Sequence, residues 1–320
     1  MSSATSAISA LAQALPSARA HRLLILIYHR VHPRPDPMFP NEVDAERFDW
    51  QMALLRRHFN PIPLAAGVAG LEAAHLPPRA VAITFDDGYA DNESVAFPIL
   101  KKHGIPATFF IATGFLDGGR MWNDSIIEAI RTSDARKLDL RDYGLGIVDL
   151  VAAEERGRVA QSIINVVKHL PPQERQARVT TVCERLNSRL PDDLMMNSSQ
   201  VRRLAEHGME VGAHTKSHPI LKTLSDEAAR AEIEGSRQVL AGITGRPVKA
   251  FAYPNGKLGT DYTRRDRDLV AELGFEYAPS TQWGAASATS DRYQLPRFTP
   301  WDRTPTRWLA RLLLTYGRPA

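Results

Sequence analysis

Short apolar runs alternate with helical patterns along most of the chain. The runs predict strands at 23–28, 80–85, 107–112, 209–213, 248–253 and 275–279. The intervening patterns predict helices at about 45–58, at 199–207, from Ser225 to about Leu240, and at 262–273. A further helix is predicted to follow Gly88 and to end near 101–103. Strands that are apolar almost throughout are typical of a parallel sheet covered on both faces. The alternation therefore favours a parallel α/β architecture.

The segment from about 120 to 196 differs from the rest of the chain. It is rich in charged residues, and its apolar positions recur at helical spacing, as at Ile163, Val166 and Val167. We interpret it as a mostly helical insertion and not as a separately folding domain. The predicted organisation is a flexible segment at 1–20 followed by one domain over 21–320 that carries this insertion.

Chemically versatile side chains follow several predicted strands. They are His29 after 23–28, Asp86 and Asp87 after 80–85, His214 after 209–213, and Pro254-Asn255-Gly256 after 248–253. In parallel α/β folds the residues just beyond the carboxyl ends of the strands build the active site. The sequence therefore predicts that these segments meet.

Two of the segments offer metal ligands. In Thr84-Phe85-Asp86-Asp87-Gly88, one carboxylate can bind a metal while the other bonds to water, although Asp-Gly is also a common turn. His214 and His218 can share a metal from one face of a helical turn, although ten histidines also allow such a pair by chance. One Asp and two His with an open position are typical of catalytic zinc.

The remaining two segments are less specific. Phe251-Ala252-Tyr253-Pro254-Asn255-Gly256 predicts a tight turn, which can present a backbone N–H to an oxyanion or can simply be a turn. His29, taken alone, is more often a structural residue than a catalytic one.

In combination and order, these segments resemble the polysaccharide deacetylase family, carbohydrate esterase family four, whose domain is called the NodB homology domain. Gly104-Ile105-Pro106-Ala107-Thr108-Phe109-Phe110 also looks like the family's strand after the aspartate motif. The resemblance covers about 23 to 280 without the insertion. It implies a distorted (β/α) barrel and a hydrolase that removes N-acetyl groups from an N-acetylhexosamine-containing polysaccharide or glycan precursor. It also implies a divalent metal, with Zn²⁺ favoured.

Carried over residue by residue, the resemblance assigns roles to the motif positions. It implies that Asp86 is the general base and that Asp87, His214 and His218 bind the metal. It also implies that the backbone N–H of Asn255 stabilises the oxyanion.

The general acid follows from a second similarity. The Tyr28-His29 pair is similar to a motif that precedes the aspartate motif in poly-N-acetylglucosamine deacetylases, which makes His29 the candidate acid. The chain departs from the family in having Ala252 where an arginine commonly pairs with the base, and Asn255 where a tyrosine is common. It also has no evident C-terminal Leu-x-His motif. Arg297 is the candidate source of the missing positive charge.

Composition limits the alternatives. The chain has 320 residues, 43% hydrophobic and 24% charged, with a net charge of +4 and one cysteine. These values are ordinary for a soluble globular protein, and no run of Lys or Arg indicates nucleic-acid binding. The longest apolar run is too short to span a bilayer and no signal peptide is evident, so we expect a cytoplasmic protein without a stable membrane span. Its expected partner is a carbohydrate, with association with polysaccharide-assembly proteins left open.

Other functions stay open from the sequence alone. They are a related metal amidase acting on a small non-sugar amide or cyclic imide, a non-catalytic glycan-binding protein, and a structural metal protein. Two aspartates together with two histidines argue against binding alone, because binding needs no base beside a metal. Trp122, Trp283 and Trp301 are candidates for stacking on sugar rings, or for core packing.

Overall fold

The computed structural model describes residues 21–317 and is an α/β fold built on a largely parallel sheet. In sheet order the strands are β7 (Glu210–Ala213), β4 (Ala107–Ile111), β3 (Ala80–Phe85), β1 (Arg22–Tyr28) and β9 (Ala286–Ser287), and β2 (Asn60–Pro61) also pairs with β3. Only β9 pairs in the antiparallel sense within this described sheet. The parallel α/β architecture predicted from the sequence is confirmed. The segment predicted to be flexible, 1–20, lies outside the described residues.

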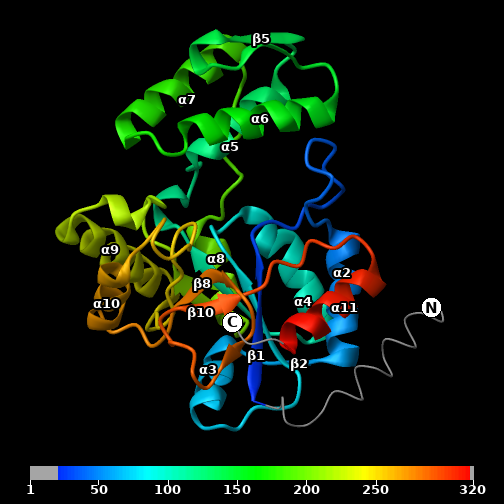
Figure 1. Ribbon diagram of the computed structural model, residues 1–320, viewed down its shortest axis with the longest axis vertical. Coiled ribbons are helices and arrows are strands. Elements are labelled where there is room, and N and C mark those ends of the chain that lie inside the picture. Colours follow the sequence, from blue (N-terminus) through cyan, green and yellow to red (C-terminus); the bar gives the residue numbers. More distant parts are fainter. Residues whose placement is uncertain (1–20, 318–320) are drawn as a thin grey trace.

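Helices cover the sheet on both sides. They are α2 (Ala45–His58), α3 (Leu64–Glu72), α4 (Phe97–His103), α8 (Ser198–Glu206), α9 (Asp226–Thr244), α10 (Arg264–Glu272) and α11 (Pro305–Tyr316). Figure 1 shows α2, α4 and α11 on one side of β1, and α9 and α10 on the other. Because both faces are covered, every residue of β3 is buried, which explains its unbroken apolar sequence.

The ends of two helices follow the sequence signals. The side chain of Ser225 accepts a hydrogen bond from the backbone N–H of Ala228 and caps α9. Gly104, at φ +62°, ends α4 directly after the predicted helix end at 101–103. Helix α9 continues past Leu240 and stops only at Gly245, the first residue that turns left-handed, at φ +66°.

Two predicted strands are not continuous strands, and those predictions were wrong. Within 248–253 and 275–279 the residues form single bridges, Ala213 to Phe251 and Ala250 to Tyr277. The next strand, β8 (Pro279–Trp283), pairs instead with β10 (Leu295–Arg297) in a separate sheet. Phe251 and its neighbours are fully buried, so the apolar run reports burial and not strand pairing.

The segment predicted to be an insertion forms a layer of its own. It contains α5 (Trp122–Thr132), α6 (Ala153–Val167) and α7 (Pro172–Leu186), together with an unpredicted antiparallel hairpin of β5 (Lys137–Leu140) and β6 (Gly146–Asp149). The signal for the hairpin was the alternating Lys-Leu-Asp-Leu of β5. Short helical turns also occur at 92–96, 113–115, 141–143 and 221–223.

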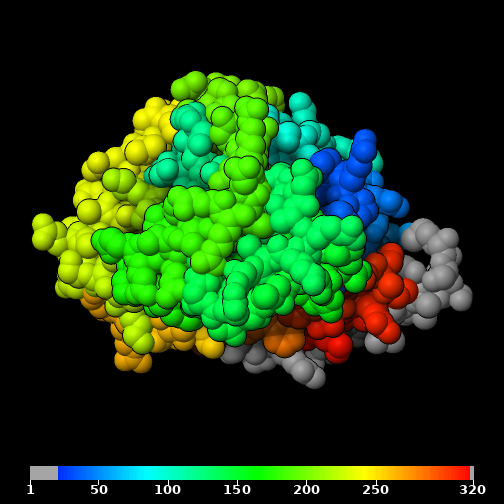
Figure 2. Space-filling model, turned by 90° about the horizontal axis from the view of Figure 1, so that it is seen from above, coloured from blue at the N-terminus to red at the C-terminus, as the bar shows by residue number. Residues whose placement is uncertain are grey.

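The insertion has a separate apolar cluster, which it shares with Met38 from the loop after β1. In that loop Asp36 accepts hydrogen bonds from Arg131 of α5 at 3.0 and 2.7 Å. The insertion lies above the sheet in Figure 1, and its green atoms cover the upper face in Figure 2. The loop after β1 therefore fixes the insertion over the carboxyl ends of the strands.

None of the described helices is both long enough and apolar enough to cross a membrane.

Gly88 is predicted to be intolerant of a side chain. Its φ is +92°, and an added Cβ would lie 2.9 Å from Cγ2 of Ile111. We expect Gly88→Ala to lower the free energy of unfolding by about 1–2 kcal/mol, measured by urea denaturation. Gly242→Ala in α9 is the control, because an added Cβ there meets nothing within 4 Å. It should raise stability by about 0.4–1 kcal/mol, whereas unchanged stability of Gly88→Ala would contradict the predicted intolerance of a side chain at Gly88.

Candidate active site and metal-binding residues

The turn after β3 sends two adjacent carboxylates in different directions. Asp87 has φ +76° and Gly88 has φ +92°, so the chain leaves the strand through two left-handed residues. The backbone N–H of Gly88 donates to the carbonyl of Asp86 at 3.0 Å and closes the turn. As a result Asp86 faces Arg297, while Asp87 faces the two histidines.

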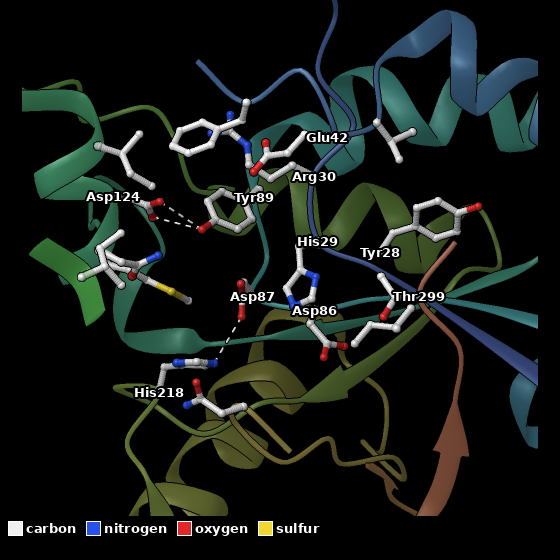
Figure 3. Close-up of a pocket in the computed structure, with 18 of the residues that line it drawn as sticks. Tyr28, His29, Arg30, Glu42, Asp86, Asp87, Tyr89, Asp124, His218 and Thr299 are labelled. Atoms are coloured by element: carbon white, nitrogen blue, oxygen red, sulfur yellow. Dashed lines mark hydrogen bonds and ion pairs between the residues drawn. The ribbon is translucent and has the colours of Figure 1, made fainter. Parts of the chain in front are cut away.

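Asp87, His214 and His218 form a cluster suited to one metal ion. Oδ1 of Asp87 lies 3.4 Å from Nε2 of His214 and 3.3 Å from Nε2 of His218, the contact drawn in Figure 3. Nδ1 of His214 is 2.7 Å from the carbonyl of Ala252, which fixes the ring and leaves Nε2 facing the cluster. Oδ1 of Asp87 is buried and has no hydrogen-bond partner among the described residues. Such a donor set, closely spaced around an unsatisfied oxygen, fits zinc or a similar cation.

The histidines meet through an irregular loop, and the predicted helical turn was wrong. Thr215 and His218 have φ +65° and +53°. The side chain of Thr215 accepts from the backbone N–H of His218 at 3.1 Å. Glu232 of α9 accepts from the two intervening backbone N–H groups at 2.9 and 2.8 Å. Because these bonds hold the loop, the rings of His214 and His218 meet without a helix, although they are four residues apart.

The protonation states of Asp87 and His218 suit a cation. Burial would raise the pKa of Asp87, but the neighbouring imidazoles of His214 and His218 hold that pKa below its ordinary value. Burial lowers the pKa of His218 to about 4, so that ring is neutral at neutral pH. Burial would also lower the pKa of His214, but the neighbouring carboxylates outweigh it and raise that pKa.

Asp86 is held by a buried arginine from the far end of the chain. Nη1 and Nη2 of Arg297, in β10, donate to the two oxygens of Asp86 at 2.7 Å each. Arg297 also donates to the carbonyl of Ser280 at 2.7 Å and is 1% exposed. Burial would raise the pKa of Asp86, but the charge of Arg297 keeps it low. Ala252, at the family's arginine position, cannot make this pair.

His29 and Asn255 lie beside these groups. His29 follows β1 and is exposed, and Figure 3 shows its ring close to Asp86 and Asp87. Asn255 has φ +59° and its carbonyl accepts from Thr281 at 2.9 Å, which fixes the tight turn. One cavity of 520 Å³ is lined by all the predicted site residues: His29, Asp86, Asp87, His214, His218 and Asn255.

The cavity also contains groups that sequence reasoning missed. The hydroxyl of Tyr89 donates to Asp124 of α5 at 3.1 and 3.2 Å. The guanidinium of Arg30 lies 4.8 Å from the centre of the Tyr89 ring and pairs with Asp91 at 2.7 Å. Tyr89 directly follows the motif that ends at Gly88, and Arg30 directly follows Tyr28-His29, so their positions could have indicated that they belong to the site. No recognised motif lies beside Asp124 in α5.

The three tryptophans have different environments. Trp122 and Trp301 line the cavity. Trp283 is not among its lining residues and stacks on Phe298 with ring centres 5.9 Å apart. The first two therefore stay candidates for contact with a substrate.

A second group of metal-type side chains, His32, Asp36 and Glu42, is a poor metal site. Both oxygens of Asp36 are engaged by Arg131, and Glu42 is exposed and bonded to His32. An ion there would have to displace a guanidinium.

Removal of Arg297 should destabilise the fold, because it leaves the buried carboxylate of Asp86 without a positive partner. We expect Arg297→Met to lower the free energy of unfolding at pH 7 by about 3–5 kcal/mol. Because the pair lowers the pKa of Asp86, its stabilisation is complete above the unfolded pKa of about 3.9 and is lost as the pH falls through the lower folded value. The deficit should therefore shrink in acid, as measured by urea denaturation at several pH values.

The control is Arg230→Met, which removes an exposed pair with Glu272 and should change stability by no more than about 1 kcal/mol. A deficit of Arg297→Met that stays the same down to pH 3 would contradict the predicted linkage.

Comparisons with known proteins identify the family and the fold. The family model for polysaccharide deacetylase matches residues 73–137 and 174–278. YxkH of Bacillus subtilis (strain 168), which its name assigns to the polysaccharide deacetylases, is 22% identical over 219 residues. That match covers 68% of this chain, which spans only half the length of that curated relative.

Solved structures show the same fold. The Streptococcus pyogenes deacetylase PplD has a TM-score of 0.63 at 20% identity, covering 91% of this chain and 98% of its own. IcaB from Ammonifex degensii has a TM-score of 0.59 at 19% identity, covering 93% of this chain and 98% of its own. These similarities confirm the predicted fold of the polysaccharide deacetylase type. Because the family model matches more than half of its residues, the chain belongs to the polysaccharide deacetylase family.

Proposed function

We propose that this protein is a metal-dependent hydrolase that removes N-acetyl groups from an N-acetylhexosamine-containing polysaccharide or glycan precursor. The observation that carries the proposal is the unsatisfied Oδ1 of Asp87 between His214 and His218, beside an Asp86 that Arg297 holds in place. Family membership supports the deacetylase reaction, and the donor set supports the dependence on a metal.

Asp87, His214 and His218 would hold the ion, for which Zn²⁺ is the favoured identity because a carboxylate and two imidazoles suit it. When bound, the ion supplies positive charge that polarises the acetamide carbonyl and makes water in the site more acidic.

Asp86 acts as the general base in this proposal. Its carboxylate is ionised and fixed by two hydrogen bonds, so it is ready to accept a proton from the attacking water. Arg297 makes the carboxylate a weaker base but prevents it from turning toward the cation. We infer that orientation is the larger benefit, since Asp86 and Asp87 adjoin and must keep separate roles.

Asn255 and His29 complete the reaction. The turn at Asn255 is fixed by Thr281, so its backbone N–H can donate to the oxyanion without reorganisation. His29 is exposed in the cavity and can donate a proton to the departing amine nitrogen.

The proposal extends to the substrate, the partners and the location. Trp122 and Trp301 line the cavity and are suited to stacking on sugar rings. Association with polysaccharide-assembly proteins stays a prediction, and so does the cytoplasmic location. A protein acting there would meet a glycan precursor or a lipid-linked sugar.

Acetate release from N-acetylglucosamine oligomers by zinc-reconstituted protein tests the proposal. We expect Asp86→Asn to lower kcat by about 10²–10⁴-fold, because it removes the base while leaving all three metal ligands. Zinc content, measured by atomic absorption, should be unchanged. Near-normal turnover by Asp86→Asn would show that the assigned base is wrong.

The wild-type protein provides a second test, which concerns the class of substrate. Zinc bound without acetate release from any oligomer would contradict the glycan substrate and favour an amidase for small amides or cyclic imides.

A further inference from the structure

Asp124 is a buried carboxyl group in the wall of the active-site cavity that none of the proposed steps uses. It lies in the first turn of α5 and is 3% exposed. It lines the same cavity as Asp87 and His29, although it belongs to α5 and not to the central sheet. Figure 3 shows it across the cavity from His29, linked only to Tyr89 among the residues drawn.

The hydrogen bonding of Asp124 is incomplete. Both of its oxygens accept from the same Tyr89 hydroxyl, at 3.1 and 3.2 Å. No ion pair to Asp124 is present within residues 21–317, because the nearby Arg30 is bonded to Asp91. A carboxylate has room for about four hydrogen bonds, so most acceptor positions of Asp124 are unused.

Burial without a positive partner is costly. Burial raises the pKa of Asp124 to about 7, and the negative charge of Asp87 adds to this effect while Arg30 opposes it. A group that only held Tyr89 in place could be a neutral amide at a lower cost. The carboxyl is therefore better explained by a partner that enters the cavity.

The surroundings of Asp124 suit a sugar ring. Trp122, two residues earlier in the same helix, lines the cavity, and the guanidinium of Arg175 lies 5.0 Å from its ring. Ligand sites typically combine apolar and aromatic walls with a few well-placed polar groups. An aromatic ring beside a carboxyl with free acceptors offers a sugar both a face to stack on and a partner for its hydroxyl groups.

We propose that Asp124 binds the substrate by accepting hydrogen bonds from hydroxyl groups of the sugar whose acetamido group is cleaved, while Tyr89 fixes the carboxyl. This proposal rests on the proposed function and extends it, because it assigns sugar recognition to a residue of the insertion. The competing explanation is that Asp124 only supports Tyr89 and, through it, the metal-binding turn.

Two substrates separate these explanations. One is the N-acetylglucosamine hexamer, and the other is 4-nitrophenyl acetate, which has an acetyl group but no sugar. For Asp124→Asn we expect kcat/KM on the hexamer to fall about 10- to 100-fold, the effect of losing hydrogen bonds to a charged group, mostly through KM. Ester hydrolysis should stay within about twofold of wild type because the metal and Asp86 remain.

Two further variants complete the experiment. Tyr89→Phe keeps the ring that Arg30 covers but removes the hydroxyl, so it should show a smaller loss confined to the hexamer. Asp149→Asn, an exposed change in β6 of the insertion, is the matched control and should have no effect.

Several results would overturn the proposal. Equal losses on both substrates, or loss of bound zinc, would assign Asp124 a structural role. Unchanged kinetics on both would leave it without a role in binding. If the wild-type protein cleaves the ester but not the hexamer, the proposed function fails. The role of Asp124 is then tested by measuring hexamer binding by calorimetry. Weaker hexamer binding by Asp124→Asn would support sugar recognition, and equal binding would refute it.

Discussion

The site depends on separating two adjacent carboxylates that are both buried at the end of one strand. Asp86 and Asp87 would repel each other if they shared one environment, and each needs positive charge to stay ionised away from water. The left-handed turn through Gly88 sends them in opposite directions. Arg297 then compensates Asp86, while the two histidines of the loop lie beside Asp87. The different surroundings of the two carboxylates follow from this arrangement.

The rest of the fold supports that arrangement from distant parts of the chain. Arg297 of β10 lies 211 positions from Asp86 in sequence, so Asp86 is held only after β10 has docked. Glu232 fixes the histidine loop from α9. The insertion is anchored to the loop after β1 by Asp36 and brings Asp124 into the cavity. The cavity is thus built jointly by barrel and insertion.

Much of the site could be predicted because its residues follow strands, and parallel strands end at one edge of a sheet. The adjacency of His29, Asp86 and Asp87 needed only that rule. The apolar run ending at Tyr253 misled the strand prediction, because buried packing and strand pairing give the same pattern. Asp124 could not be found, since nothing in a charged helical segment reveals which carboxyl will face a cavity formed by distant residues.

X-ray absorption at the zinc edge of the reconstituted protein tests the central claim most directly. The account predicts one zinc ion with two imidazole nitrogens and a carboxylate oxygen at about 2.0–2.2 Å. It also predicts that His218→Ala removes one imidazole contribution, whereas Asp86→Asn leaves the spectrum unchanged. A spectrum that is insensitive to His218→Ala, or that changes on Asp86→Asn, would contradict the assigned ligands and the separation of the two carboxylates.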